Sequence, residues 1–363
     1  MFGEINQHMA FYRLLVLVLC QRIPRTMTIP IIYSGRNVID GGKEAAQMIS
    51  TRVTQQWHLR YPVISAPMLG VSGGALASSV SSAGGLGMIA VGPAQDGHWI
   101  KSEVAKIAPG LHFGVGFIEW DVARRPQILE ETLSLQPFLV SISFGSVKPY
   151  VHRVHEAGAL VVTQVNSLED ARSAEECGVD AVVIQGREAG GHTGELSTLT
   201  LLQSVVPIMH IPVLAAGGIA TPQGICAALM AGAEGVWMGT RFEACHESLL
   251  VDRIISRLIE SHAEDTVITR LYDQILHAPW PSKYPGRVVS NQFVRRWLSQ
   301  EITDDAAKEL TEGVQAYDPD TIPIYAGESV QFVQDRESAH HVVVQLMQQA
   351  EAWWKERSQV ISS

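Results

Sequence analysis

The sequence has little charge and lacks the common motifs for binding nucleotide phosphates. Only 18% of its 363 residues are charged and the net charge is −10. Its arginine pairs, at residues 124–125 and 295–296, are isolated, so no basic stripe is available for nucleic acid, and we expect no such partner. It contains neither a Walker A sequence nor a G-x-G-x-x-G turn followed by a ribose-binding acid, so we do not expect P-loop or Rossmann-type binding.

Cysteines are scarce and too far apart in the sequence to share a metal. Cys20, Cys177, Cys226 and Cys245 include no C-x-x-C pair, so we expect no structural zinc and no other metal site. Unpaired cysteines suit a reducing compartment, and we expect a cytoplasmic protein.

Long hydrophobic runs are missing as well. Residues 14–20 are apolar, but the run is too short to span a bilayer and no small-residue cleavage site follows it. We therefore expect no stable membrane insertion. Residues 1–50 are predicted to be an irregular extension outside the fold, with a weak targeting or anchoring segment as the open alternative.

A regular succession of apolar, β-branched runs begins near residue 51. The runs start 21 to 31 residues apart, at Val63, Gly87, Phe113, Phe138, Ala159, Ala181, Pro212 and Gly235. Ala-rich segments with helical periodicity, such as residues 167–177 and 222–231, lie between them. Eight strand–helix units of similar length predict an α/β fold, a (β/α)₈ TIM barrel. A doubly wound open sheet is the alternative, and the even spacing makes it the weaker one.

Glycine-rich loops follow the last two predicted barrel strands. Gly217 and Gly218 come after the seventh strand, and Gly239 and Thr240 come after the eighth. Barrels commonly bind a phosphate between these two loops, where backbone N–H groups can point at the anion. The pattern therefore favours a cofactor that carries a phosphate.

Two other strand ends offer surfaces for a ring system. Ala66, Pro67 and Met68 follow the first strand and form an apolar edge that suits one side of an aromatic ring. Gln164 and Gln185 end the fifth and sixth strands and could hydrogen-bond the polar rim of a ring. Packing of the barrel mouth, and glutamines paired with backbone, are the alternatives.

A histidine lies in the most glycine-rich loop. Residues 185–194 read QGREAGGHTG and follow a fully apolar strand, so His192, directly after Gly191, falls at the end where barrels keep their active sites. A neutral imidazole can remove a proton near neutral pH, whereas a solvated or capping histidine is the alternative.

Four separated motifs resemble the nitronate monooxygenase (2-nitropropane dioxygenase) family of flavoproteins. They read RYPVISAPMLG, IQGREAGGHTGE, LAAGGIATPQGICAALMAGAEGVWMGTRFEACHES and YAGESV, and the similarity covers roughly residues 51–350. The resemblance implies a TIM barrel that carries FMN, with a smaller, mainly helical domain inserted after strand 8 and closing the mouth. It implies the domain bounds 51–246 for the barrel, 247–325 for the small domain and 326–363 for the return to the barrel and a closing helix.

The resemblance also implies roles for single residues. His192 would be the catalytic residue, and the cofactor would be held by Ala66, Pro67, Met68, Gln164, Gln185, Gly191, Gly217, Gly218, Gly239 and Thr240. Some relatives carry lysine where Gln164 stands and aspartate where Gln185 stands, which affects the tuning of the flavin more than its binding. Trp280 and Tyr284 are further candidates for the pocket wall, with packing between the domains as the alternative. For Arg241 and Glu188 we expect salt bridges on a helix face or at a strand end instead of catalysis.

The implied activity is the oxidation of alkyl nitronates, and in some members of neutral nitroalkanes, by FMN and O₂ to a carbonyl compound and nitrite. Two alternatives stay open. The same glycine–histidine loop occurs in FMN-dependent enoyl-thioester reductases that use NAD(P)H, and a flavin-binding module without this chemistry is the non-enzymatic alternative. A homodimer is a further expectation.

Overall fold

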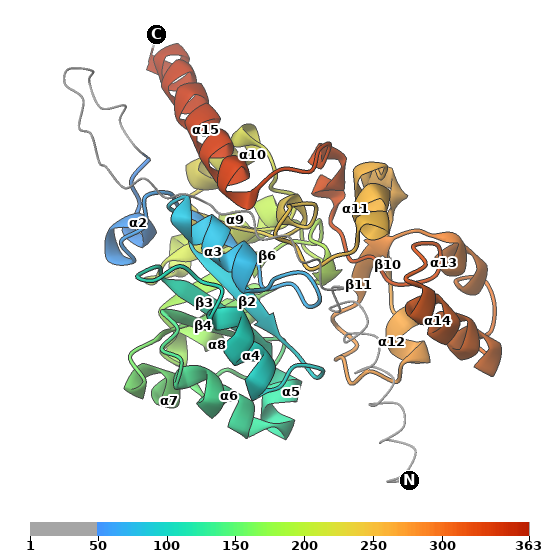
Figure 1. Ribbon diagram of the computed structural model, residues 1–363. Helices are drawn as coiled ribbons and strands as arrows, with labels where there is room; N and C mark the ends of the chain where they lie inside the picture. The colour runs from blue at the N-terminus through green and yellow to red at the C-terminus, as the bar shows by residue number, and fades with distance from the viewer. Residues whose placement is uncertain (1–48, 363) are drawn as a thin grey trace.

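The computed structural model describes residues 49–362, and it contains a closed barrel of eight parallel strands (Figure 1). The strands are β1 (Val63–Ser65), β2 (Gly87–Val91), β3 (Phe113–Ile118), β4 (Leu139–Ser143), β5 (Leu160–Val165), β6 (Ala181–Gln185), β8 (Val213–Ala216) and β9 (Gly235–Met238). Neighbours in the chain pair in order around the sheet, and β1 also pairs with β9. The ring closes where Ile64 bridges Leu86 and the Ser65 N–H donates to the Leu86 carbonyl at 3.0 Å. The predicted barrel is confirmed, and the open sheet is wrong.

Helices cover the outside of the barrel. They are α3 (Gly74–Ser82), α4 (Gly97–Val104), α5 (Glu119–Arg124), α6 (Pro126–Leu133), α7 (Val151–Glu156), α8 (Leu168–Glu176), α9 (Thr198–Val205) and α10 (Pro222–Met230). The two helices predicted in detail, α8 and α10, begin at hydroxyl caps: Ser167 accepts from the Asp170 N–H and Thr221 from the Gly224 N–H. The long C-terminal helix α15 (Ala339–Ser362) packs on α10 and α3.

Side chains along each strand point alternately into the barrel and toward the helices, and this alternation determines which of them line the barrel mouth. In β6, Val183 belongs to the cluster inside the barrel, whereas Val182 and Ile184 belong to the layer between strands and helices. Val162 in β5 is likewise an inner residue. Because side chains alternate with a period of two, Gln164 and Gln185 are the next inward positions toward the carboxyl ends of their strands.

The opposite end of the barrel is plugged by a short helix. Helix α2 (Arg52–Gln56) starts at Thr51, whose hydroxyl donates to the Glu234 carbonyl at 2.6 Å. Val53 and Trp57 are buried in the same cluster as the inner strand residues. Residues 1–48 of the predicted N-terminal extension lie outside the described residues.

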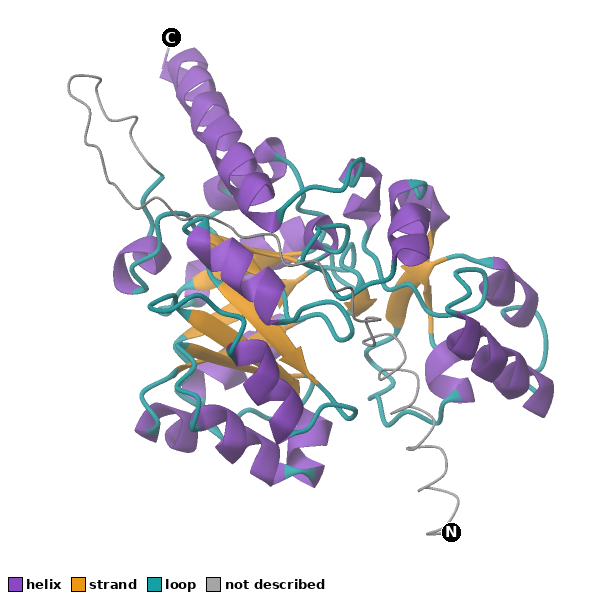
Figure 2. Ribbon diagram, viewed as in Figure 1, coloured by secondary structure: helices purple, strands orange, loops and turns teal. Residues whose placement is uncertain are grey.

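The segment from residue 247 to 325, which we call the small domain, contains more β-structure than the sequence predicted (Figure 2). Its elements are α11 (Asp252–Ile259), η3 (Ala263–Asp265), β10 (Thr266–Thr269), α12 (Leu271–Ile275), β11 (Gly286–Val289), α13 (Gln292–Trp297) and α14 (Asp304–Ala316). Within this segment, the sequence predicts helix over residues 293–310. That prediction is wrong, because α13 ends before Leu298 and α14 begins after Thr303.

A three-stranded antiparallel sheet joins the small domain to the barrel. Strand β7 (Gly191–His192) lies in the loop after β6, and it pairs with β11, which in turn pairs with β10. In this register Gly286 is opposite His192, and the Thr193 N–H donates to the Pro285 carbonyl at 3.0 Å. The glycine-rich loop of the barrel is therefore also an edge strand of the small domain.

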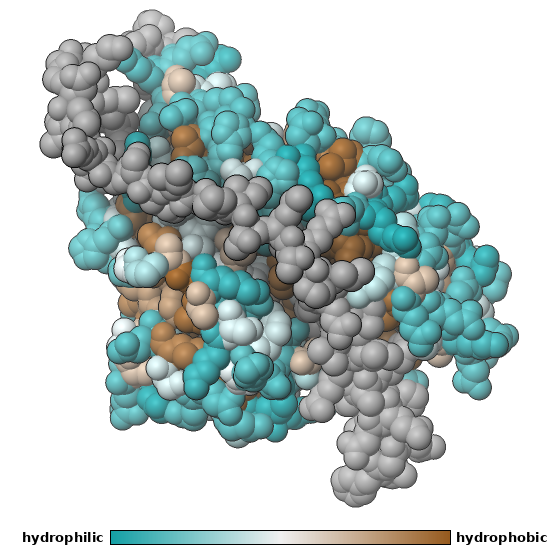
Figure 3. All heavy atoms as spheres, in the orientation of Figure 1, coloured by the Kyte–Doolittle hydropathy of each residue, from teal (hydrophilic) through white to brown (hydrophobic). Residues whose placement is uncertain are grey.

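The outer surface of the described residues is mixed in polarity. On the face in Figure 3 the small domain is largely hydrophilic, and apolar residues appear as smaller areas over the barrel. The large apolar side chains that are exposed belong to four separate segments: Leu196 and Leu199, Met230, Leu298 and Ile302, and Phe332. They single out no face for a homodimer, which stays a prediction. Among the described helices, none is both long enough and apolar enough to cross a membrane.

Candidate active site

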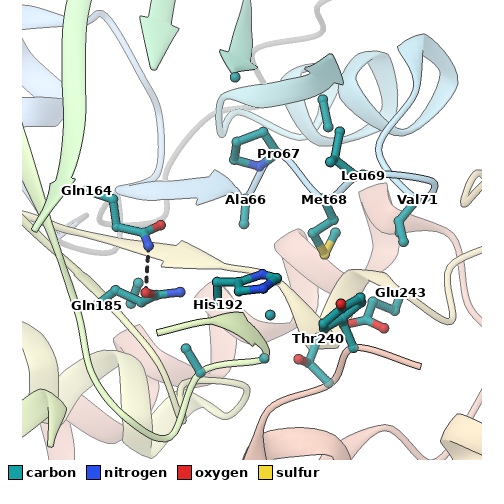
Figure 4. Close-up of a pocket in the computed structure, with 18 of the residues that line it drawn as sticks. Ala66, Pro67, Met68, Leu69, Val71, Gln164, Gln185, His192, Thr240 and Glu243 are labelled. Carbon is teal, nitrogen blue, oxygen red and sulfur yellow. Dashed lines mark hydrogen bonds between the residues drawn. The ribbon is translucent and has the colours of Figure 1, made fainter. Parts of the chain in front are cut away.

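A cavity of about 240 Å³ opens at the carboxyl ends of the barrel strands, under the small domain. The residues expected to be catalytic or to bind the cofactor all line it: Ala66, Pro67, Met68, Gln164, Gln185, Gly191, His192, Gly217, Gly218, Gly239 and Thr240. Ile254, Trp280 and Tyr325 close the cavity from the other side. In Figure 4 the His192 ring lies between the glutamine pair and Thr240, below Ala66. The fold thus brings together residues that are up to 174 positions apart in the chain, from 66 to 240.

The turn after β1 forms a fixed apolar wall. The Ala66 N–H donates to the Met238 carbonyl at 2.7 Å, and the Ser72 hydroxyl, itself buried, donates to the Ala66 carbonyl at 2.9 Å. Pro67 packs directly on the backbone of β3, where a Cβ on Gly116 would lie 2.2 Å from the proline ring. The cavity therefore has one rigid side without a charged group.

The two glutamines bind each other. The Gln164 Nε2 donates to the Gln185 Oε1 at 2.5 Å, and the Asn166 Nδ2 donates to the same oxygen at 3.1 Å. Asn166 also holds the Gln185 carbonyl at 2.8 Å. With its oxygen engaged twice, the Gln185 amide presents its nitrogen along the cavity toward His192, as Figure 4 shows. The pair supplies neutral amide groups at this edge of the site.

The glycine loops after β8 and β9 lie at the same cavity. Gly217 and Gly218 have φ values of 103° and 70°, a backbone conformation that L side chains rarely adopt. The Thr240 hydroxyl accepts from the Gly327 N–H at 3.0 Å, which ties this loop to the segment that returns from the small domain. Among the described residues no lysine or arginine lines the cavity, so an anion bound here would be held by backbone N–H and hydroxyl donors.

Glu243 is a pocket residue that sequence reasoning missed. It follows the turn after β9, is 4% exposed and lines the cavity. Burial raises the pKa of its carboxyl to about 8, although a hydrogen bond with the Thr240 side chain acts in the opposite direction. At neutral pH this carboxyl is therefore mostly uncharged and does not repel an anionic ligand. Its position inside a glycine-rich motif gave no signal, because glutamates one turn after a strand are usually exposed.

His192 is held by an acid that the sequence did not point to. Its Nε2 lies 3.0 and 3.1 Å from the two carboxylate oxygens of Asp273, and both side chains are buried. Asp273 comes from α12 of the small domain, 81 residues further along the chain. A single aspartate in a short helix has no motif around it, so only the folded contact identifies it.

Aromatic side chains surround the imidazole. The Trp280 ring stacks on His192 with 3.5 Å between ring centroids and 9° between planes. Phe144 contacts both rings edge-on and has a φ of 70°, which is an outlier for a bulky residue. Tyr284 packs on Phe144 at 5.4 Å and is not one of the residues that line the cavity, whereas Trp280 is.

The two charged neighbours, Arg241 and Glu188, have structural partners. Arg241 forms a salt bridge with Glu337 at 2.7 Å, just before α15. Glu188 accepts from the Thr198 N–H at 3.0 Å at the start of α9. The Arg241 contact agrees with the salt bridge expected for it, whereas the Glu188 contact is a hydrogen bond to a backbone N–H.

Comparison with known proteins places these features in a family. The family model described as nitronate monooxygenase matches residues 98–349. A (3aS,4S,5R,7aS)-5-hydroxy-7a-methyl-1-oxo-octahydro-1H-indene-4-carboxyl-CoA dehydrogenase of Mycobacterium tuberculosis is 33% identical over 63% of this chain, and the match spans 65% of that protein's length. A nitronate monooxygenase of Neurospora crassa is 28% identical over 85% of this chain and 94% of that protein.

Solved structures share the fold over nearly their whole length. FabK of Thermotoga maritima matches with a TM-score of 0.75 and 27% identity, over 86% of this chain and 100% of that one. A nitroalkane oxidase of Streptomyces ansochromogenes matches with a TM-score of 0.70 and 25% identity, over 85% of this chain and 99% of that one.

Proposed function

Because the chain belongs to the nitronate monooxygenase family of oxidoreductases, we propose that it binds FMN and oxidises alkyl nitronates, and neutral nitroalkanes, with O₂ to carbonyl compounds and nitrite. The observation that carries the proposal is the single cavity that joins the apolar wall, the amide pair, the glycine loops and a buried histidine. We further propose that the barrel, residues 51–246, binds the cofactor and that the small domain, residues 247–325, covers it.

The residues around the cavity fit FMN. At Gly218 a Cβ would meet only the Glu188 side chain, at 3.4 Å, and at Gly239 it would meet Met68 and Ala66 at 3.4 and 3.6 Å, so side chains here would narrow the cavity. Gly217, Gly218, Gly239 and Thr240 would hold the phosphate through N–H and hydroxyl donors. The apolar wall at residues 66–68 would lie along the ring system, and Gln164 and Gln185 would reach its polar groups.

When bound, FMN would supply the redox chemistry of the oxidation, with O₂ as the final oxidant. His192 handles the proton. A neutral nitroalkane has an acidic C–H beside the nitro group, and a neutral imidazole can remove that proton near neutral pH. With a preformed nitronate, no such proton remains for the imidazole to remove. The apolar residues around it keep water away from this proton transfer.

A second candidate is an NAD(P)H-dependent reductase that acts on an enoyl thioester. The name of the Mycobacterium tuberculosis relative, which is a CoA ester dehydrogenase, favours a thioester substrate, and the fold similarity to FabK is as extensive as that to the nitroalkane oxidase. Against it, the part of the cavity wall that the structure describes has no lysine or arginine to receive the phosphates of such substrates.

The experiment that separates the candidates is an anaerobic mixing test. The purified protein is checked for a yellow cofactor, which is released by heat and identified as FMN or another flavin. It is then mixed without oxygen with propyl nitronate or with NADH. Bleaching or a semiquinone spectrum with propyl nitronate, followed by nitrite release in air, supports the proposed activity. Rapid bleaching by NADH alone supports the reductase, and a colourless protein that takes up no flavin would reject both.

A further inference from the structure

The hydrogen bond between His192 and Asp273 assigns a particular proton to a particular nitrogen. The two side chains are 7% and 5% exposed, so water does not compete for the contact. A carboxylate has only acceptor atoms, and an imidazole nitrogen that meets it must therefore donate. The Nε2 lies within 3.1 Å of both Asp273 oxygens and so carries the proton.

In a neutral imidazole the proton can be on one nitrogen only. With Nε2–H directed at Asp273, the Nδ1 nitrogen has the free lone pair. Trp280 covers one face of the ring, and the Nε2 edge is filled by the carboxylate. The nitrogen that remains for a ligand in the cavity is therefore Nδ1, and it is an acceptor.

The hydrogen-bonding and stacking partners of this ring belong to the small domain, whereas Phe144 of the barrel contacts it edge-on. Asp273 is in α12, Trp280 is in the loop after α12, and Gly286 in β11 is the strand partner of His192. The barrel contributes the backbone of the loop that carries His192, and contacts with the small domain fix the orientation of the His192 side chain. A histidine on a free barrel loop would have both tautomers and several rotamers available.

We propose that Asp273 is a positioning residue that fixes His192 in its Nε2–H tautomer, so that Nδ1 is the base that removes the substrate proton. The kinetic effect of this positioning rests on the proposed oxidation of nitroalkanes, whereas the assignment of the tautomer does not depend on that function. The same logic operates in serine hydrolases, where a buried aspartate holds the catalytic imidazole in the working tautomer.

The tautomer is measured directly by nitrogen NMR on the full chain with its cofactor and with ¹⁵N-labelled histidine. The chain has 13 histidines, and the His192 signals are those missing from the His192→Gln spectrum. We expect Nε2 at the shift of a protonated nitrogen and Nδ1 at the shift of an unprotonated one. In Asp273→Asn the amide can donate to the ring, and the pattern should reverse or become a mixture. A wild-type ring with its proton on Nδ1, or an unchanged pattern in Asp273→Asn, would overturn the proposal.

The kinetic test compares two forms of one substrate. Nitroethane requires a base to remove the proton beside its nitro group before it can be oxidised, whereas ethylnitronate has already lost that proton. Asp273→Asn should lower kcat for nitroethane by about 10²- to 10⁴-fold, while kcat for ethylnitronate changes by less than about 3-fold. Asp273→Glu, which keeps the carboxylate, should recover part of the loss with nitroethane. The matched control is Asp305→Asn, an exposed aspartate on α14, which should leave both rates unchanged.

The outcomes separate this proposal from the proposed function. Equal losses with nitroethane and ethylnitronate would mean that Asp273 only supports the structure, and would overturn the positioning role. If wild-type protein turns over neither compound, the proposed function fails, and the NMR spectra alone decide the role of Asp273. If Asp273→Asn does not fold, the wild-type spectrum still decides.

Discussion

The barrel and the small domain contribute to the cavity in different ways. The barrel supplies main-chain features and neutral side chains: the wall at Pro67, the amide pair and the glycine loops. The small domain supplies the groups that fix one reactive side chain, Asp273 and Trp280. The contrast supports the proposed division of roles, in which the barrel would bind the cofactor and the small domain would orient His192 for proton transfer. Substitutions in the two regions should therefore change different measured quantities.

We expect the largest loss of turnover from a substitution at His192, where the barrel and the small domain meet. His192→Asn should retain FMN and lose turnover of nitroethane by about 10²- to 10⁴-fold, because the amide cannot take the proton. The measurement is nitrite release together with the flavin absorbance spectrum. His152→Asn, at an exposed position on α7, is the control. Unchanged turnover of nitroethane would remove the histidine from the mechanism.

The pH dependence of stability tests whether the carboxyl of Glu243, at the barrel mouth, is neutral at neutral pH. Its pKa is about 8 in the folded protein and about 4.5 when unfolded, so the folded state binds the extra proton between these values. Stability should therefore fall as pH rises from about 4.5 to 8 and level off above that. One pKa unit corresponds to about 1.4 kcal/mol, so the total loss is at most about 5 kcal/mol.

Glu243→Gln should abolish this pH dependence, because the amide does not ionise. The measurement is urea unfolding of both proteins from pH 5 to 9. The variant should be more stable than the wild type above pH 8, and the difference should shrink toward pH 5. Parallel pH curves for the two proteins would show that the buried carboxyl titrates normally.

Gly218 tests cofactor binding by the barrel alone. Gly218→Ala forces an alanine into a φ of 70°, which costs about 1–2 kcal/mol and shifts the loop that is expected to hold the phosphate. FMN affinity should fall about 5- to 30-fold, with kcat at saturating FMN little changed. Gly110→Ala is a matched control, because Gly110 has a φ of 82° and open space around it. Equal FMN affinity in both variants would argue against a phosphate at Gly218.

A substitution at Trp280 tests whether the small domain affects turnover without affecting FMN binding, and its expected effect is the smallest. Trp280→Phe keeps an aromatic ring against His192 but reduces the stacked area, so kcat with nitroethane should fall about 3-fold while FMN affinity stays constant. Trp297→Phe removes an indole of the same domain that packs on Phe293, and it should leave kcat unchanged. A loss of FMN affinity in Trp280→Phe would contradict the division between the two regions.

The barrel could be predicted from the sequence because its signals are local and repeated. Eight apolar runs with even spacing indicate the strands, and the order of neighbours around the barrel follows from their order in the chain. The candidate residues of the barrel mouth all follow strands, so topology alone brings them to one end. Gln164 and Gln185 reach the cavity because each is two residues beyond an inner valine.

The small domain could be predicted only coarsely, because its key contacts are not local. Strand β7 has two residues and no strand pattern of its own, and it exists only because β11 pairs with it. Asp273 is an ordinary acid in the sequence, and burial against His192 gives it its role, just as burial does for Glu243 at the barrel mouth. The break between α13 and α14 was missed because residues 298–303 contain neither glycine nor proline.

The most direct test of this account is a crystal structure of the protein with FMN bound. We predict phosphate oxygens about 2.7–3.2 Å from the backbone nitrogens of Gly217 and Gly218, and His192 still bonded through Nε2 to Asp273 with Nδ1 facing the ring system. FMN bound outside this cavity, or an imidazole rotated away from both Asp273 and the flavin, would contradict it.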